Sequence, residues 1–502
     1  MSDEKFKSSK AFVLTSVGAA VGLGNALRFP GLCAKYGGGA FLAVYFIALV
    51  VMGIPILNAE IALGRKIRGG APKCMKSLNK RAEPLGWASA VNSLIVAVIY
   101  AGLLGWILAM VIKIAPLCNS SDKMTSIEIG SYFFGNVLKK EGFSYLICVL
   151  GVAGWAAMYF CMRGGAKSLS ASAKFTVIIP ILLLTFMAVR GLTYANSGEA
   201  LHALFVPDFK ALLSAELWLN ALGQVFFSLS ILVGIMPAYG GYLPDKANVF
   251  RDSLIIAAAD FFVSVLSSVV LFTTLYGCGM QGRITQSGIV TAFIVYPVAI
   301  TRFGGGKILN GIVGIAFYLS LAMMALQSAV SMIEAFLNPL SEKFKINKRK
   351  LAGVISVIGA GISLIFATPI AETGLDIADH FANYFNILFL GIAECIVLGT
   401  GMKKQNLAGE INRYCKKLKM PEKPFVFSIR VVCPAALIFL TGWGLYNLVF
   451  GEGGRYAGYP FWAQAVFGWS VTLIVFSSGF IINAIYKLCS PHIIYKKPVR
   501  NF

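Results

Sequence analysis

Long runs of hydrophobic residues alternate with short polar segments along the whole chain. A helix that crosses the hydrocarbon core of a bilayer needs about 20 residues at a rise of 1.5 Å each. Twelve runs reach that length: residues 11–35, 39–64, 87–117, 143–162, 169–190, 216–241, 249–279, 309–340, 350–369, 375–401, 426–450 and 460–487. The pattern therefore predicts an all-α integral membrane protein with about 12 transmembrane helices.

The composition agrees with this prediction. Of the 502 residues, 57% are hydrophobic and only 13% are charged, and the mean hydropathy is +0.75. These values exclude an ordinary soluble globular chain and indicate a lipid bilayer as the surrounding medium. The formal net charge of +22 also suits nucleic-acid-binding proteins, but the lysines and arginines stand in short loops between hydrophobic runs. No nucleic-acid partner is therefore expected.

Clusters of lysine and arginine follow the second, fourth, eighth and tenth predicted spans. Loops rich in positive charge stay in the cytoplasm, and these four loops fall on the same side of a chain with twelve spans. We therefore expect a multi-pass protein of the plasma membrane with both termini in the cytoplasm. Residues 1–10 are polar and charged, which is not the pattern of a cleaved signal peptide.

The first hydrophobic run contains glycines at positions 18, 22 and 24. Each glycine exposes backbone and adds chain entropy, so the run predicts a helix that breaks near residues 20–24. Unwound backbone is tolerated at membrane depth only where it lines a cavity or is buried in protein. Its free carbonyls can hold a cation, and the amides that open the next half-helix can hold an anion. Alternatively, these small residues only let neighbouring helices pack closely.

Several charged side chains stand inside predicted spans, where a charge is costly unless it is paired or functional. Arg28 is a candidate functional residue, although an arginine that reaches the outer interface gives the same pattern. Asp260 stands one helical turn before Ser264, and a bound cation would keep its carboxylate ionised; a purely structural partner is the alternative. We interpret Glu60 and Glu394 as structural carboxylates, and expect Glu60 to accept a hydrogen bond from unwound backbone.

The string GAAVGLGNALRFP, residues 18–30, resembles the first-helix signature of the neurotransmitter:sodium symporter family, in its bacterial amino-acid transporter branch. Later segments match the family in the same order over almost the whole chain. The resemblance implies a core of five plus five helices in inverted repeat, with helices 1 and 6 broken at corresponding places. It divides the chain into a cytoplasmic segment (1–10), a first repeat (11–190), an extracellular loop (191–215), a second repeat (216–401), a cytoplasmic loop (402–425), two further spans (426–487) and a cytoplasmic C-terminus (488–502).

The resemblance also implies a substrate pocket between the two broken helices. The hydroxyl of Tyr100 would meet the substrate carboxylate. Gly22 occupies the position where monoamine transporters of the family have an aspartate, so the resemblance points to an amino acid, which brings its own carboxylate. The implied substrate-binding residues are Ala20, Gly22, Leu23, Gly24, Val96, Tyr100, Phe227, Ser228, Ser230, Val233, Ser328 and Met332.

Two sodium sites are implied in the same way. The first comprises Ala20, Asn25, Ser228 and Asp260. The second comprises Gly18, Val21, Met324, Gln327 and Ser328. Gln327 stands where the family usually has a threonine, and its amide is longer and carries an NH₂ donor beside its oxygen. The second site is therefore expected to be remodelled, weakened or replaced by a hydrogen bond.

Chloride-dependent members of the family hold the anion at positions that match Tyr45, Gln224, Ser228 and Ser264. Asp260 brings a fixed negative charge to the same place. We therefore expect the carboxylate to replace the anion, so that transport does not require chloride.

Two gates and one departure complete the resemblance. Arg28 and Asp379 are implied to form an outer gate above the substrate. For the inner gate, Glu342 is expected to pair with Lys5 or Lys7, with Phe6 in the place of the family's aromatic residue. Leu232 stands where the sixth helix usually has a glycine, which weakens the case for unwinding there and predicts a reshaped or smaller pocket.

We therefore predict a sodium-coupled secondary active symporter that imports an amino acid by alternating access. A sodium-independent or proton-coupled transporter on the same fold, a channel, and a non-transporting amino-acid sensor are the alternatives. The sequence shows no nucleophile with a base, no metal cluster and no phosphate loop, so an enzyme is not expected. The last two spans are interpreted as lipid-facing or dimer-forming, which leaves a homodimer open.

Overall fold

The computed structural model describes residues 4–120, 125–139, 142–280, 288–302, 304, 306–416, 418–450 and 458–494. Residues 1–3 and 495–502 of the two predicted cytoplasmic termini lie outside these ranges. The described chain is built of helices, and its only β-type pairing is an isolated bridge between Gly38 and Pro207. The prediction of an all-α architecture is confirmed.

Within these described ranges, ten of the predicted spans are continuous apolar helical segments. Most are single helices or helices with one π-helical turn inside them. Their bounds are Gly39–Ile67, Lys80–Asn119, Tyr145–Met162, Ala166–Gly191, Val249–Gly277, Gly306–Phe344, Lys348–Ala367, Ala371–Gly401, Glu422–Asn447 and Phe461–Cys489. The two remaining spans, the first and the sixth, are the broken ones.

The first span consists of α1 (Ser9–Ala20), followed by a π-helical turn (Gly24–Arg28) and α2 (Phe29–Lys35), and the two parts are bent by 51°. The amide of Gly22 donates to Asn25 Oδ1 at 3.1 Å instead of continuing the helix. A Cβ on Gly22 would lie 2.6 Å from Ser328 Oγ, and one on Gly24 would lie 2.4 Å from Phe227 Cε1. The glycines therefore permit both the break and a close approach of other helices.

The sixth span consists of α11 (Ala215–Ser228) and α12 (Ile235–Gly241), with non-helical residues 229–234 between them. Ser230 and Leu232 have φ values of +53° and +65°, which are left-handed conformations that cost a non-glycine residue on the order of 1–3 kcal/mol. The expectation that a leucine at position 232 argues against unwinding is therefore wrong. Packing and hydrogen bonds hold these residues in place of glycine flexibility.

Three side chains hold this unwound segment. Glu60, on α4 (Ile54–Ile67), accepts a hydrogen bond from the Leu232 amide at 2.8 Å, which confirms the role expected of this carboxylate. Ser230 Oγ donates to the carbonyl of Ala19 at 2.9 Å, and the hydroxyl of Ser93 donates to the carbonyl of Val233. The two breaks are thus tied to each other and to helices that are continuous.

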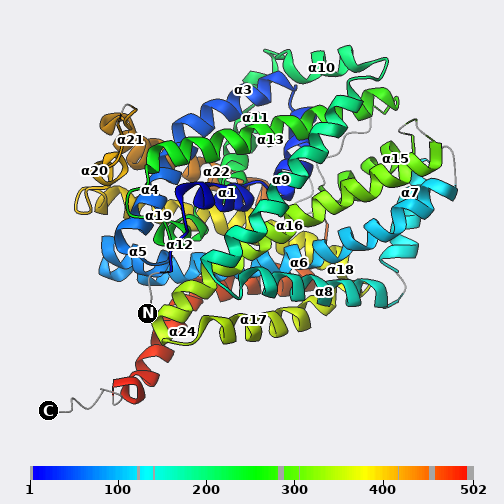
Figure 1. The fold of residues 1–502 in the computed structure, drawn as a ribbon. Coiled ribbons are helices and arrows are strands. Elements are labelled where there is room, and N and C mark those ends of the chain that lie inside the picture. Colours follow the sequence, from blue (N-terminus) through cyan, green and yellow to red (C-terminus); the bar gives the residue numbers. More distant parts are fainter. Residues whose placement is uncertain are drawn as a thin grey trace.

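The helices lie side by side in one bundle (Figure 1). The short helices α5 (Ala71–Leu78), α20 (Leu407–Asn412) and α21 (Glu422–Phe427) gather at one end with the last turns of α24 (Ser470–Ile494). At the opposite end lie α7 (Ser126–Tyr132), α10 (Ser197–Phe205) and α15 (Tyr296–Thr301). The loops that the sequence assigns to one side of the membrane therefore share one end of the bundle.

Candidate functional site

A buried cluster of polar side chains lies where the first break meets α13 (Val249–Gly277). The side-chain nitrogen of Asn25, Nδ2, lies 2.9 Å from Ser228 Oγ, 2.7 Å from Asp260 Oδ1 and 2.8 Å from Ser264 Oγ. These are more acceptors than its two hydrogens can serve. Ser228 Oγ also donates to Asp260 Oδ1 at 2.7 Å. The structure therefore brings together three of the four residues implied for the first sodium site.

Asp260 is fully buried, and its second carboxylate oxygen accepts from the hydroxyl of Tyr45 at 2.9 Å. In the described part of the chain no lysine, arginine or histidine forms an ion pair with it. A buried carboxylate with only neutral partners among oxygen atoms suits a small hard cation, which would balance its charge. The oxygens of Asp260 and Ser228 thus suit sodium, whereas Asn25 here turns its side-chain nitrogen to them and its oxygen to the Gly22 amide.

The five residues implied for the second sodium site lie on two segments that pack together, and Gly18 lies directly against Gln327. Gly18 and Val21 end α1, and Met324, Gln327 and Ser328 lie on α16 (Gly306–Phe344). However, Gln327 Oε1 is within hydrogen-bond distance of two hydroxyls of α9 (Ala166–Gly191), namely Thr176 at 2.9 Å and Ser172 at 3.3 Å. The oxygen of residue 327 is therefore turned to α9. In this orientation the amide oxygen is held by α9, so the implied second site has no free side-chain oxygen from residue 327.

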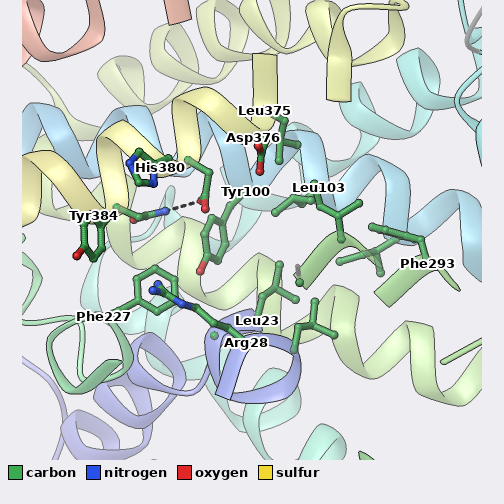
Figure 2. Close-up of a pocket in the computed structure, with 17 residues that line it drawn as sticks. Leu23, Arg28, Tyr100, Leu103, Phe227, Phe293, Leu375, Asp376, His380 and Tyr384 are labelled. Carbon is green, nitrogen blue, oxygen red and sulfur yellow. Dashed lines mark hydrogen bonds between the residues drawn. The ribbon is translucent and has the colours of Figure 1, made fainter. Parts of the chain in front are cut away.

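A cavity of about 450 Å³ lies beside the first break. It lies within the range of about 300–1,000 Å³ that is usual for small-molecule sites. Figure 2 shows Leu23, Arg28 and Phe227 on one side of it and Asp376 and His380 on the opposite side, with Tyr100 between them.

Four of the implied substrate residues line this cavity: Leu23, Gly24, Tyr100 and Phe227. The others do not line it and are buried, at the two breaks and on α6 (Glu83–Ser120) and α16. These buried residues are Ala20, Gly22, Val96, Ser228, Ser230, Val233, Ser328 and Met332. The cavity thus reaches the expected pocket without exposing all of it.

The two outer-gate residues face the same cavity but do not form an ion pair. The guanidinium of Arg28 lies over the ring of Phe227, 5.4 Å from its centroid. Asp379 accepts a hydrogen bond from Asn383 at 2.7 Å (dashed in Figure 2). Both side chains therefore have other partners in this structure.

Sequence reasoning did not identify several cavity residues. Leu103 and Ile107 follow Tyr100 by three and seven positions on α6 and so share its helical face, a spacing that could have revealed them. Gly288, Ile289 and Phe293 come from a short helical segment that is no predicted span. No local pattern in the sequence would have placed that segment over the site.

The inner gate differs from the prediction. Lys5 pairs with Asp245 at 2.9 Å, whereas Glu342 pairs with Lys73 at 2.5 Å. The expected pairing of Glu342 with Lys5 or Lys7 is therefore wrong. Phe6, expected in the place of the family's aromatic residue, is 3% exposed. The hydrogen bond and charge of Lys5, together with the charge of Arg68, lower the pKa of the Asp245 carboxyl below its usual value.

Phe6 explains this difference. Its ring packs edge-to-face against Tyr239, Tyr242 and Phe12, and its amide donates to the Tyr242 carbonyl at 2.9 Å. These contacts dock the N-terminal segment on α12, beside the turn that carries Asp245. Glu4 meanwhile pairs with Lys348 at 3.1 Å. We call residues 4–9 the N-terminal latch.

Comparisons with known proteins agree with this architecture. The model of the sodium:neurotransmitter symporter family matches residues 3–115 and 124–490. An uncharacterised sodium-dependent transporter of Methanocaldococcus jannaschii is 30% identical over 471 residues, which cover 90% of this chain and 94% of the relative. The mouse sodium-dependent neutral amino acid transporter B(0)AT3 is 32% identical over 298 residues, or 54% of this chain and 48% of the relative.

A solved structure has the same fold. The crystal structure of MhsT in complex with L-phenylalanine superposes with a TM-score of 0.75 at 24% identity, and the match covers 88% of this chain and 99% of that one.

Proposed function

Because the chain belongs to the sodium:neurotransmitter symporter family, whose members are transporters and not enzymes, we propose that it imports an amino acid together with sodium by alternating access. The observation that carries this proposal is the buried contact of Asn25 and Ser228 with Asp260 directly beside the first break. It combines a fixed negative charge with freed backbone groups in one place.

The first break also supplies groups that suit an amino-acid carboxylate. Gly24 starts a new helical turn, and amides at the start of a helix attract negative charge. The hydroxyl of Tyr100 lines the same cavity. We propose that the amides of Leu23 and Gly24 and this hydroxyl bind the substrate carboxylate. A carboxylate there would lie beside the sodium ion held by Asn25, Ser228, Asp260 and the carbonyl of Ala20.

The side chains expected around the rest of the substrate are apolar, namely Val96, Phe227, Val233 and Met332. Leu232 does not reduce this space, because its side chain points away toward α19 (Ile387–Gly401), where a Cβ on Gly391 would lie 2.7 Å from Leu232 Cδ1. We therefore propose a neutral amino acid with an apolar side chain as substrate. MhsT in its complex with L-phenylalanine and the neutral amino acid transporter B(0)AT3 are consistent with this choice.

Sodium and substrate would bind as one charge-balanced unit. Each ligand then raises the affinity for the other by the same factor, because the coupling free energy between two sites is reciprocal. The carboxylate of Asp260 would supply the negative charge that chloride supplies in other members. Transport would therefore be independent of chloride. In the same proposal the chain lies in the plasma membrane with both termini in the cytoplasm, and a homodimer remains an open hypothesis.

Uptake by proteoliposomes tests the proposal. The twenty amino acids are screened with an inward sodium gradient and, separately, with potassium in place of sodium. We expect accumulation of apolar amino acids with sodium alone. Accumulation in potassium, driven by a proton gradient, would contradict sodium coupling and favour a proton-coupled transporter. Sodium-dependent binding without counterflow of labelled substrate would identify a sensor.

A further inference from the structure

We propose that the side-chain amide of Gln327 takes the place of a second sodium ion, so that transport is coupled to one sodium ion per substrate. This inference rests on the proposed function. It concerns the point where α1, α9 and α16 meet below the first break. The argument depends on which polar groups at this point have partners.

The break frees backbone oxygens next to Gln327. The amide of Gly22 donates to the Asn25 side chain, and the amides of Asn25 and Ala26 donate to the Gly22 carbonyl at 3.2 and 3.3 Å. As a result, no amide of the described chain reaches the carbonyls of Gly18 and Val21. Acceptors without donors are what an ion at this point would bind, and what an amide N–H can satisfy as well.

Gln327 extends into the same place. Its side chain runs along the bare backbone of Gly18, where a Cβ would lie 2.6 Å from Gln327 Cγ and 3.3 Å from Gln327 Cδ. The residue is 1% exposed. Two of its neighbours, Ser172 and Thr176, hold the amide oxygen from the side of α9. The oxygen end of the Gln327 amide is therefore held by α9, and this contact fixes the direction of the NH₂ group.

The other end of the amide has no partner. Gln327 Nε2 is buried and forms no hydrogen bond with any described residue, and the same is true of Ser328 Oγ. A buried N–H without an acceptor costs about 1–3 kcal/mol, so a small shift that brings Nε2 to a freed carbonyl or to Ser328 Oγ is favourable. The NH₂ group then supplies the partial positive charge that these oxygens lack.

Charge balance distinguishes this point from the Asp260 cluster. The second set, Gly18, Val21, Met324, Gln327 and Ser328, contains no carboxylate. Without an ion this set has no net charge, so a neutral N–H donor is sufficient to satisfy its oxygens. The first set contains the buried carboxylate of Asp260, whose described partners are all neutral. Only the first set requires a cation.

The orientation of the amide decides between two outcomes. The hydroxyls of Ser172 and Thr176 also lie 2.9 and 3.0 Å from the carbonyls of Leu169 and Ser172. If they donate there, they accept from a reversed amide, and Gln327 Oε1 faces the freed carbonyls as a sodium ligand. A reversed amide would thus retain the second ion. Sodium stoichiometry separates the two orientations.

The test is equilibrium binding to the purified full-length protein, with ²²Na⁺ and with labelled substrate at graded sodium concentrations. For one coupled ion, a tenfold drop in sodium below saturation weakens substrate binding about tenfold, and for two ions about a hundredfold. We expect one bound ²²Na⁺ per protein and the tenfold dependence. Two ions and the hundredfold dependence would overturn the inference and leave the proposed function intact. Substrate binding that does not depend on the sodium concentration would overturn the proposed function itself.

Substitution by the residue that is usual in the family gives a second readout. Gln327→Thr removes the NH₂ donor and leaves a hydroxyl beside the freed carbonyls, so we expect a second bound ²²Na⁺ and the hundredfold dependence. Gln405→Thr, the same change at a residue that bonds the Ser77 carbonyl far from α1, is the matched control and should bind one ion. If Gln327→Thr does not fold, the stoichiometry of the unaltered protein still decides. A folded Gln327→Thr that binds one ion contradicts the inference.

Discussion

At the scale of single residues, Asp260 combines a charge with a set of donors that all satisfy it. Tyr45, Asn25 and Ser228 each donate to its carboxylate, and Ser264 lies beside Asn25 in the same cluster. Hydroxyl and amide donors of this kind would hold an anion if the carboxylate were absent. In the proposed function this one side chain therefore determines both the cation that the site needs and the anion that it excludes.

This gives a prediction for Asp260→Asn, which keeps an oxygen ligand and removes the charge. We expect wild-type uptake to be the same in sodium chloride and in sodium gluconate. The variant should need at least about tenfold more sodium, equivalent to about 1.4 kcal/mol, and chloride should partly restore its uptake. Radiolabelled uptake in the two salts measures this. Asp208→Asn, the same change on the exposed outer loop, serves as control. Wild-type uptake that stops in gluconate would contradict the prediction.

At the scale of elements, the sixth span shows how a helix can break without relying on glycine at every turn. Residues 229–234 include two non-glycine residues in the left-handed region, and one of them, Leu232, is fully buried. This strained backbone is stabilised because Glu60 accepts a hydrogen bond from the Leu232 amide and the leucine side chain packs against α19. The break is thus stabilised by another helix and not by local sequence.

Glu60 should accordingly act as an acceptor and not as a charge. Glu60→Gln keeps an oxygen for the Leu232 amide, whereas Glu60→Leu leaves this buried N–H unsatisfied at a cost of about 1–3 kcal/mol. We expect the melting temperature in detergent to fall clearly for the leucine variant and little for the glutamine variant, with substrate binding following the same order. Equal stability of Glu60→Leu and the wild type would show that the hydrogen bond does not hold the break.

The N-terminal latch is a second element whose role follows from its contacts. Phe6→Ala removes a ring that is buried against Tyr239, Tyr242 and Phe12. Deleting a buried phenylalanine costs on the order of 3 kcal/mol, and this cost applies to the latched state alone. The equilibrium should therefore shift about a hundredfold toward a state in which the predicted cytoplasmic end of α1 is released.

A cysteine introduced at the buried residue Ser16 on α1 reports this release. A membrane-impermeant maleimide added from the cytoplasmic side should label it much faster in the Phe6→Ala background. Lys7→Ala changes an exposed residue of the same segment and should leave the labelling rate unchanged. Equal rates in all three proteins would show that Phe6 does not hold the latch closed.

At the scale of the whole molecule, the sequence predicted the helices and the central contacts better than the connections. Glycines 18, 22 and 24 indicated the first break, and the depth of Asp260 indicated a site at the middle of the bundle. Both features can be read from the sequence because glycines and charged residues are unfavourable inside a membrane-spanning helix. The ion pairs of Lys5 and Glu342 lie near the surface at one end of the bundle, where many opposite charges are within reach and no pattern selects one.

The position of Phe293 over the cavity is a further feature that local patterns do not encode. It comes from a helical segment of residues 288–301 that is too short to be a span, and its ring stacks on that of Phe133 at 4.4 Å. Phe133 in turn belongs to the loop between the third and fourth spans. Two outer loops therefore pack on each other over the site, and only tertiary contacts define that arrangement.

In the proposed function this cavity is the outer access route of alternating access. Arg28 and Asp379 face the cavity but do not form an ion pair in this structure. They could therefore move together and close the cavity once substrate and sodium are bound. A cysteine introduced at Leu103, a partly exposed residue of the cavity wall, should then react readily with an impermeant reagent in potassium. It should react at least about tenfold more slowly with sodium plus substrate, a population shift of about 1.4 kcal/mol.

The protection should depend on the gate pair itself. With Asp379→Asn in addition, the attraction to Arg28 is lost, and we expect sodium and substrate to protect the Leu103 cysteine much less. Labelling of the parent protein gives the background from its ten native cysteines. If protection is the same with and without Asp379, closure depends on the packing of the outer loops around Phe293 and not on the charge pair. If ligands give no protection in either protein, the cavity is not the route by which substrate enters.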